Sequence, residues 1–193
     1  MPKDFIIERA EPCYQGFFKA TRYFLRHALH RGGMSALLSR EVFERHDAVM
    51  VIPYDKAQQA VVMIEQFRPG AAVNPGHTGS AWLLEFPAGM IEPGQTPVAA
   101  AQRECAEEIG LPIANLEQLY TYFTSPGGCR ERLTLFCASV DSRKAGGIQG
   151  LATEHEDLKV VVVKLADLEA QIESGAIADA STLLAVQWLL RQK

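Results

Sequence analysis

Three carboxylates near the middle of the chain have the residue types and spacing to do chemistry. Glu104, Glu107 and Glu108 stand at positions i, i+3 and i+4, which on a helix puts their Cβ atoms on one face, about 5–6 Å apart. Like charges at this spacing repel, and near the C-terminal end of a helix the dipole also disfavours them. A hard divalent cation such as Mg²⁺ would turn this repulsion into binding. The alternative is a solvated acidic face, which the spacing alone does not exclude.

The segment around these carboxylates predicts a helix with defined ends. Thr96 can cap it, Pro97 fits its first turn, and the run VAAAQRECAEEI contains no helix breaker before Gly110. We therefore expect a helix over residues 97–109, with the acidic cluster in its second half.

The elements that must position this helix are mainly strands. Residues 14–67 contain short runs of Val, Ile, Phe and Tyr that predict strands of one or two antiparallel sheets. Residues 69–81, rich in Gly and Pro, predict a loop, followed by a short strand at 82–86. Further strands are expected at about 116–123, 131–140 and 158–165, and helices at about 166–174 and 181–192. Strands without a regular βαβ alternation predict an α+β fold or a mixed sheet between helices.

Composition sets the broad class of protein. The chain has 193 residues, 48% of them hydrophobic and 22% charged, which suits one domain of ordinary size, at most with a short extension. A net charge of −4 argues against nucleic-acid binding through a global positive field. The four cysteines form no C-x-x-C pair. No apolar run approaches the roughly 20 residues of a membrane span, and early charges argue against a signal peptide. We expect a cytoplasmic protein that binds neither membrane nor nucleic acid.

The letters around the helix resemble a known family signature. From Gly89, the sequence GMIEPGQTPVAAAQRECAEEIGL is similar to the Nudix hydrolase pattern G-x5-E-x7-R-E-U-x-E-E-x-G-U, where U is aliphatic. The matching residues are Gly89, Arg103, Glu104, Glu107, Glu108, Gly110 and Leu111. Gln95 replaces the first Glu, and Cys105 replaces an aliphatic residue, for which it is a suitable small hydrophobe. In the family the first Glu looks mainly structural, so we expect altered loop stability more than lost activity.

The resemblance also implies a fold and a reaction. The family fold is an α/β/α sandwich with a mixed β-sheet, which we expect over residues 46–193. An N-terminal β-rich region, residues 1–45, would precede it and form a dimer. The family cleaves nucleoside diphosphates linked to another moiety and uses a divalent metal ion.

Features outside the signature resemble the ADP-ribose pyrophosphatase branch, over a span from about Cys13 to Trp188. Pro126 lies 16 residues after Gly110, and the segments IEQFR, GLATEHEDLKV and LLAVQWL are also similar. This branch implies a homodimer that uses Mg²⁺, or alternatively Mn²⁺, to hydrolyse ADP-ribose to AMP and ribose 5-phosphate. Enzymes such as GDP-mannose pyrophosphatases can also carry an SPGG-like segment, so another nucleoside diphosphate sugar, such as GDP-mannose or ADP-glucose, remains an alternative. A non-catalytic ADP-ribose-binding module is a third hypothesis, supported only by Gln95.

The resemblance assigns roles in catalysis. The implied metal ligands are Glu104, Glu108, Glu156 and the backbone carbonyl of Ala88, and Glu107 completes the cluster. Glu154 resembles the catalytic base, although Glu156 and Asp157 are near enough in sequence to exchange roles with it, and it could also be an ordinary exposed loop acid. Arg103 would orient the carboxylates through an ion pair with its i+4 partner Glu107, or else be a surface arginine.

The resemblance also assigns substrate contacts. Arg68 could grip a phosphate with its bidentate fork, or else be an exposed charge at the end of a strand. Phe17, Phe18 and Arg40 resemble positions that reach into the partner subunit and hold adenine, although an aromatic pair in a strand is more often core. The remaining matches to substrate contacts are Met90, Ser125, Pro126, Gly127 and Glu131.

Overall fold

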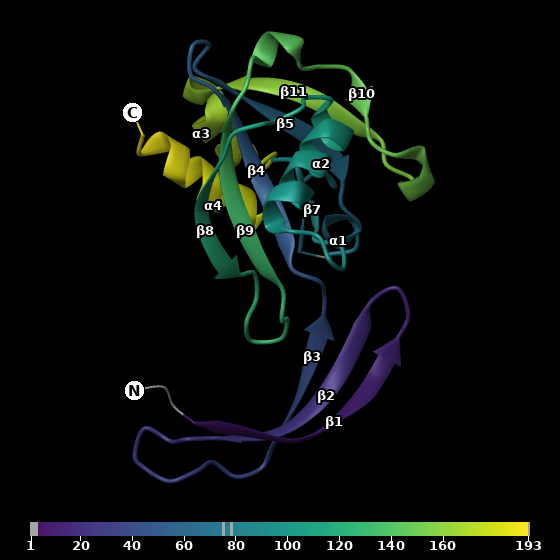
Figure 1. Cartoon of the computed structure of the whole chain (residues 1–193), viewed down its shortest axis with the longest axis vertical. Helices are drawn as coiled ribbons and strands as arrows, with labels where there is room; N and C mark the ends of the chain where they lie inside the picture. The colour runs from purple at the N-terminus through teal and green to yellow at the C-terminus, as the bar shows by residue number, and fades with distance from the viewer. Residues whose placement is uncertain (1–3, 75, 78, 193) are drawn as a thin grey trace. The chain divides into compact units, whose positions relative to one another are not determined.

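The computed structural model describes residues 4–74, 76–77 and 79–192 (Figure 1). Contacts between Cα atoms divide the chain into two compact units. One unit comprises residues 1–47 and 123–132, and the other comprises residues 48–122 and 133–193.

The described part of the first unit contains a three-stranded antiparallel sheet in the order β1-β2-β3. The strands are β1 (Phe5–Gln15), β2 (Lys19–His27) and β3 (Leu38–Glu44). The sequence prediction omitted β1, whose alternation is interrupted by register shifts between Ile7 and Arg9 and between Pro12 and Tyr14. Residues 123–132 join this sheet through a parallel bridge between Phe43 and Cys129.

Exposed ion pairs, and no buried side chains of β1, accompany the backbone pairing of this sheet. The Arg26–Glu8 and Arg22–Glu41 ion pairs link strands at 2.6 and 2.7 Å, and all eleven residues of β1 are exposed. Exposed ion pairs contribute only about 0–1 kcal/mol each. The sheet therefore lacks the buried apolar face that normally stabilises a small sheet.

The second unit is built on a mixed sheet in the order β10-β11-β5-β4-β9-β8, with β6 beside β5 and β7 beside β4. Strands β4 and β9 are parallel, whereas β4–β5, β5–β6 and β5–β11 are antiparallel. The strands are β4 (Ala48–Asp55), β5 (Ala60–Phe67), β6 (Trp82–Glu85), β7 (Ala88–Met90), β8 (Leu116–Phe123), β9 (Arg132–Ser139), β10 (Ile148–Gln149) and β11 (Leu158–Lys164).

Helices cover both faces of this sheet. Strand β4 shows why: Val49 and Val51 pack in the cluster formed with α2 (Pro97–Ile109), whereas Met50 and Ile52 pack in the cluster formed with α3 (Leu168–Glu173) and α4 (Ala180–Leu190). Alternate side chains of a strand point to opposite faces, so a continuous apolar run needs cover on both. Helices α2, α3 and α4, which provide this cover, are seen in Figure 1. The predicted α+β sandwich with a mixed sheet is confirmed.

Helix α2 has the predicted ends. Thr96 accepts a 3.2 Å hydrogen bond from the Ala99 N–H, and Gly110 has a φ of +68°, the left-handed conformation in which glycine ends helices. The loop predicted at 69–81 contains a short helix, α1 (Pro69–Ala72). Short 3-10 helices lie at Ser142–Lys144, Ala152–Glu154 and Leu165–Asp167. No helix in the described residues is long and apolar enough to cross a membrane.

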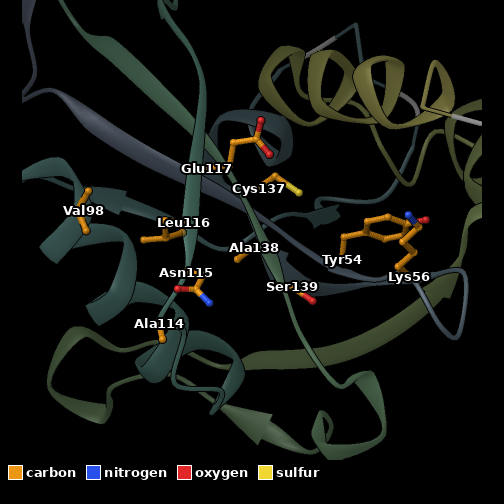
Figure 2. Close-up of a pocket in the computed structure, with 10 residues that line it drawn as sticks. All are labelled: Tyr54, Lys56, Val98, Ala114, Asn115, Leu116, Glu117, Cys137, Ala138 and Ser139. Carbon is orange, nitrogen blue, oxygen red and sulfur yellow. The ribbon is translucent and has the colours of Figure 1, made fainter.

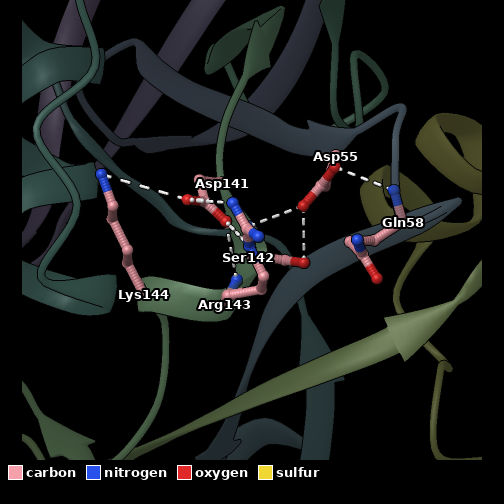
Figure 3. A network of polar contacts seen from close by, with 6 residues as sticks. All are labelled: Asp55, Gln58, Asp141, Ser142, Arg143 and Lys144. Atoms are coloured by element: carbon pink, nitrogen blue, oxygen red, sulfur yellow. Dashed lines mark hydrogen bonds and ion pairs between the residues drawn. The ribbon is translucent and has the colours of Figure 1, made fainter.

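A buried carboxylate ties the β4–β5 turn to the segment after β9 (Figure 3). Asp55 is buried, and its Oδ1 accepts a 3.0 Å hydrogen bond from the Gln58 N–H. Its Oδ2 accepts hydrogen bonds from the backbone N–H and the hydroxyl of Ser142, at 2.9 and 2.8 Å. These donors, the Ser142 N–H foremost, lower the pKa of Asp55 to about 2.

We expect Asp55→Asn to lower the free energy of unfolding at pH 7. Because the folded-state pKa lies below the ordinary 3.8, the contribution of this carboxylate is present above about pH 4 and is lost as the pH falls toward about 2. Urea unfolding at several pH values should therefore show that the difference in free energy of unfolding between wild type and variant decreases below pH 4. The exposed Asp167, which makes no capping hydrogen bond, provides the control Asp167→Asn. A gap independent of pH would contradict the prediction.

Candidate active site

Two of the three predicted carboxylates are buried on α2. Glu104 is 7% and Glu108 3% exposed, while Glu107 is partly exposed. The alternative of a solvated acidic face is therefore wrong for Glu104 and Glu108. Buried carboxylates are rare unless they are paired or bind a cation.

Arg103 links this face of α2 to the end of β7. Its Nη1 lies 2.9 Å from Oε2 of Glu107, and its Nη2 lies 2.7 Å from Oε1 of Glu104. Nη2 also donates to the carbonyl of Met90 at 3.0 Å. The expected i+4 pair is present, and the same guanidinium also holds Glu104.

Strand β7 approaches the helix closely enough to need a glycine. The Ala88 N–H donates a 2.8 Å hydrogen bond to Oε2 of Glu108. A Cβ on the next residue, Gly89, would lie 1.7 Å from Oε1 of Glu104. The Glu104 carboxylate therefore occupies the space that a side chain at residue 89 would take.

Burial changes the acidity of this pair. It raises the pKa of Glu104 to about 7, against the opposing effect of Arg103. Burial also raises the pKa of Glu108 well above its ordinary value; the Ala88 N–H opposes the shift, while the Glu104 and Glu156 carboxylates add to it. Desolvated acids that repel one another hold protons, and a bound cation would take the place of these protons.

The donor set fits a hard divalent ion with few protein ligands. In the described residues, no three or more His, Cys, Asp or Glu side chains are grouped so that they could hold a metal ion. Mg²⁺ does not require such a cage, because it commonly uses one or two carboxylates and keeps several waters or phosphate oxygens. Two buried carboxylates beside a backbone strand meet that requirement.

The acidic loop, residues 150–157, precedes β11 and is tied to helix α2. The Gly150 N–H donates to the carbonyl of Glu107 at 3.3 Å, and Oε2 of Glu156 accepts a 3.2 Å hydrogen bond from the Leu151 N–H. A Cβ on Gly150 would lie 2.7 Å from that of Glu156, so glycine permits the close passage. Glu154 is in the 3-10 helix Ala152–Glu154, but its side chain lies outside the described part of the structure.

Arg68 has a partner that the sequence analysis missed. Its Nε donates to Oε2 of Glu85 at 2.8 Å, and its Nη2 contacts the same oxygen. Glu85 is buried on β6, and burial raises its pKa while Arg68 opposes the shift. A charged residue inside the apolar run WLLEF was the signal that could have identified it.

Among the other predicted substrate contacts, Met90 lies in the second unit, whereas Phe17, Phe18 and Arg40 lie in the first. Met90 ends β7 and is exposed. Phe17 and Phe18 lie between β1 and β2 with ring centroids 4.8 Å apart. Phe17 is 86% exposed. The alternative that the aromatic pair belongs to the core is therefore wrong for Phe17. Arg40 is exposed on β3 and donates to the carbonyl of Ser39.

The segment after β8 belongs to the first unit. Ser125, Pro126 and Gly127 form an exposed turn, closed by a 2.8 Å hydrogen bond from the Cys129 N–H to the Ser125 carbonyl. Glu131 is buried and accepts a 2.9 Å hydrogen bond from the Thr124 hydroxyl. Its other oxygen lies 3.3 Å from Nε of Arg45.

A pocket of about 560 Å³ in the second unit is not lined by Glu104, Glu107 or Glu108; Figure 2 shows the residues that do line it. Val98, in the first turn of α2, lines it together with Lys56, Glu117 and Cys137. None of the residues predicted for the site borders this pocket, so it is not assigned to the substrate.

Residues 44–185 match the NUDIX domain family. The chain belongs to this family. An ADP-ribose pyrophosphatase from Haemophilus influenzae is 41% identical over 97% of this chain and 86% of its own length. A GDP-mannose pyrophosphatase from Citrobacter koseri is 33% identical over 78% of this chain and 76% of its own. A crystal structure of an ADP compounds hydrolase has the same fold, with a TM-score of 0.70 and 21% identity over 97% of this chain and 92% of that one.

The predicted membership of the Nudix hydrolases is confirmed, as is the resemblance to ADP-ribose pyrophosphatases. Nudix hydrolases generally need a divalent metal ion such as Mg²⁺. The family assignment explains why α2 buries acids that a purely structural helix would avoid.

We expect Gly89→Ala to abolish most turnover while the fold survives. The added methyl group displaces the end of a flexible side chain, Glu104, so the melting temperature should change little. A carboxylate displaced by about 1 Å can cost about 100-fold in rate. Steady-state kinetics and thermal unfolding of the same preparation measure both effects. Gly70→Ala, which has open space around the new Cβ, is the control, and near-normal kcat/KM for Gly89→Ala would refute the close-packing argument.

Proposed function

We propose that this chain is a cytoplasmic, metal-dependent ADP-ribose pyrophosphatase that forms AMP and ribose 5-phosphate. The observation that carries the reaction class is the buried pair Glu104 and Glu108, held by Arg103 and Ala88 in a Nudix domain. The substrate is supported by the relatives, because identity to ADP-ribose pyrophosphatases is higher and covers more of the chain than identity to GDP-mannose pyrophosphatases.

The chemistry explains why buried acids are useful. Water must attack a phosphorus shielded by anionic oxygens, so neutralising charge and aligning the reactants supply most of the rate. Glu104, Glu108 and the Ala88 carbonyl would hold Mg²⁺, or Mn²⁺ in its place, and Glu156 would serve a further ion. When bound, the metal would neutralise phosphate charge and lower the pKa of the attacking water.

The remaining residues would bind, orient and move a proton. Arg103 orients the carboxylates of Glu104 and Glu107 through an ion pair with each. Glu154 would accept the proton of the attacking water as general base. Arg68 would contact the diphosphate through its planar fork. Further substrate contacts are proposed for Phe17, Phe18, Arg40, Met90, Ser125, Pro126, Gly127 and Glu131.

Gln95 gives little support to a non-catalytic module. The side-chain oxygen of Gln95 accepts a 3.2 Å hydrogen bond from the backbone N–H of Glu92, and the backbone N–H of Gln95 donates to the Glu92 carbonyl at 3.0 Å. These two hydrogen bonds close the turn before α2. A glutamate carboxylate could accept the same side-chain hydrogen bond, so the substitution leaves this local role intact.

Purified protein with Mg²⁺ should release AMP from ADP-ribose, with a higher kcat/KM than for ADP-glucose, GDP-mannose or NADH. Glu104→Gln should reduce kcat/KM by about 100-fold or more and raise the Mg²⁺ concentration needed, because it removes a buried charge from the cluster. The exposed Glu117→Gln on β8 is the control. Product no higher than in a metal-free reaction would contradict the proposal, and a preference for GDP-mannose would support the alternative substrate.

We also propose that the protein is a homodimer formed through the first unit. All of β1 is exposed, including Phe5, Ile6, Ile7 and Tyr14. Exposed apolar surface of this kind on a small sheet marks an interaction site. A second copy of the chain offers the same apolar surface, and closed two-fold association is the commonest way for a protein to bury it.

Ile7→Glu should shift the protein from dimer to monomer in analytical ultracentrifugation, with at least about tenfold weaker association because burying the apolar side chain contributes about 1.5–3 kcal/mol. The control is Val162→Glu, at an exposed apolar strand position in the second unit. A wild-type protein that sediments as a monomer at micromolar concentration would refute the dimer.

A further inference from the structure

Arg68 is anchored at its backbone on both sides. Its N–H donates to the Ala81 carbonyl at 2.8 Å, and its own carbonyl accepts hydrogen bonds from the N–H groups of Ala71 and Ala72 at 3.0 and 3.1 Å. It stands at the N-terminus of α1, directly after β5. The side chain therefore leaves the backbone from a fixed position.

The guanidinium is oriented by a buried anion. Both Nε and Nη2 contact the same oxygen of Glu85, whose side chain is 5% exposed while that of Arg68 is 39% exposed. Arg has five N–H donors. Among the described residues, none accepts a hydrogen bond from Nη1, so this edge of the fork is available to a ligand oxygen.

Other acids compete for this cation. Arg68 interacts electrostatically with Glu108 and with Asp179 as well as with Glu85. Asp179 caps α4 through Oδ1, which accepts from the N–H groups of Ser181 and Thr182 at 3.0 and 2.9 Å. Its Oδ2 is buried and has no hydrogen-bond partner among the described residues. Of these three acids, Glu85 is the one that the guanidinium contacts.

We propose that Glu85 is a positioning residue that holds the Arg68 guanidinium with its unpaired edge toward the diphosphate of the substrate. A fork fixed in advance loses less conformational freedom when it grips a phosphate. Without Glu85, the unpartnered Oδ2 of Asp179 becomes the competing partner, and the fork turns away from the substrate. This inference rests on the proposed function, because it assumes that Arg68 contacts a diphosphate.

Steady-state kinetics with ADP-ribose and Mg²⁺ test this role in Glu85→Gln, Arg68→Gln and the double variant. We expect Glu85→Gln to raise KM about tenfold with kcat changed less than about threefold, since the lost interaction serves binding. The double variant should match Arg68→Gln alone, because residues that act through one contact are not additive. Glu65→Gln, which breaks the ion pair with Lys159 on the neighbouring strand, is the control.

Two outcomes would overturn the inference: an unchanged KM in Glu85→Gln, whether or not the melting temperature falls, or additive effects in the double variant. Glu85→Asp keeps the charge but shortens the side chain, and should raise KM in the same direction if Glu85→Gln does not fold. Calorimetric binding of ADP-ribose separates the two proposals. Wild type that binds without turnover refutes the proposed function, and a tenfold weaker Kd in Glu85→Gln would still support the positioning role.

Discussion

The burial of two carboxylates on one helix is the constraint on which the rest of the structure depends. An ionised acid away from water is costly unless its charge is matched. Arg103 and the Ala88 N–H offset only part of this cost for Glu104 and Glu108, so burial still raises the pKa of both carboxyls. The neighbouring elements are arranged accordingly: β7 passes close enough to exclude any side chain at Gly89, and the acidic loop is joined to α2 through Gly150.

The sheet of the second unit provides a rigid base for this arrangement. Its central strands are apolar on both faces and are covered by helices on both. Such packing leaves little freedom to the ends of β5, β6 and β7, where Arg68, Glu85 and Ala88 stand. Residues supported by such rigid elements are held more precisely than residues on loops. The first unit is different, since its sheet exposes apolar residues along the whole of β1.

Much of the site could be predicted from the spacing of residues in one segment. The positions of Thr96, Gly110 and the carboxylates depend on helix geometry, which is local, so α2 and the Arg103–Glu107 pair followed from the letters. The strand β1 was missed because bulges interrupt its alternation, and β7 and β10 because two or three residues carry no detectable period. The setting of Glu154 stays a prediction, because its side chain lies outside the described residues.

The sequence by itself determined the family, the helix and the acids that the chemistry needs, because these depend on residue types at short, fixed separations. Only the tertiary structure decided which of those acids are buried and which partners they have. Glu85 meets Arg68 across 17 positions, and Ala88 meets Glu108 across 20. Such contacts, and the pKa values that follow from them, arise from packing between elements that are distant along the chain, where local propensity carries no information.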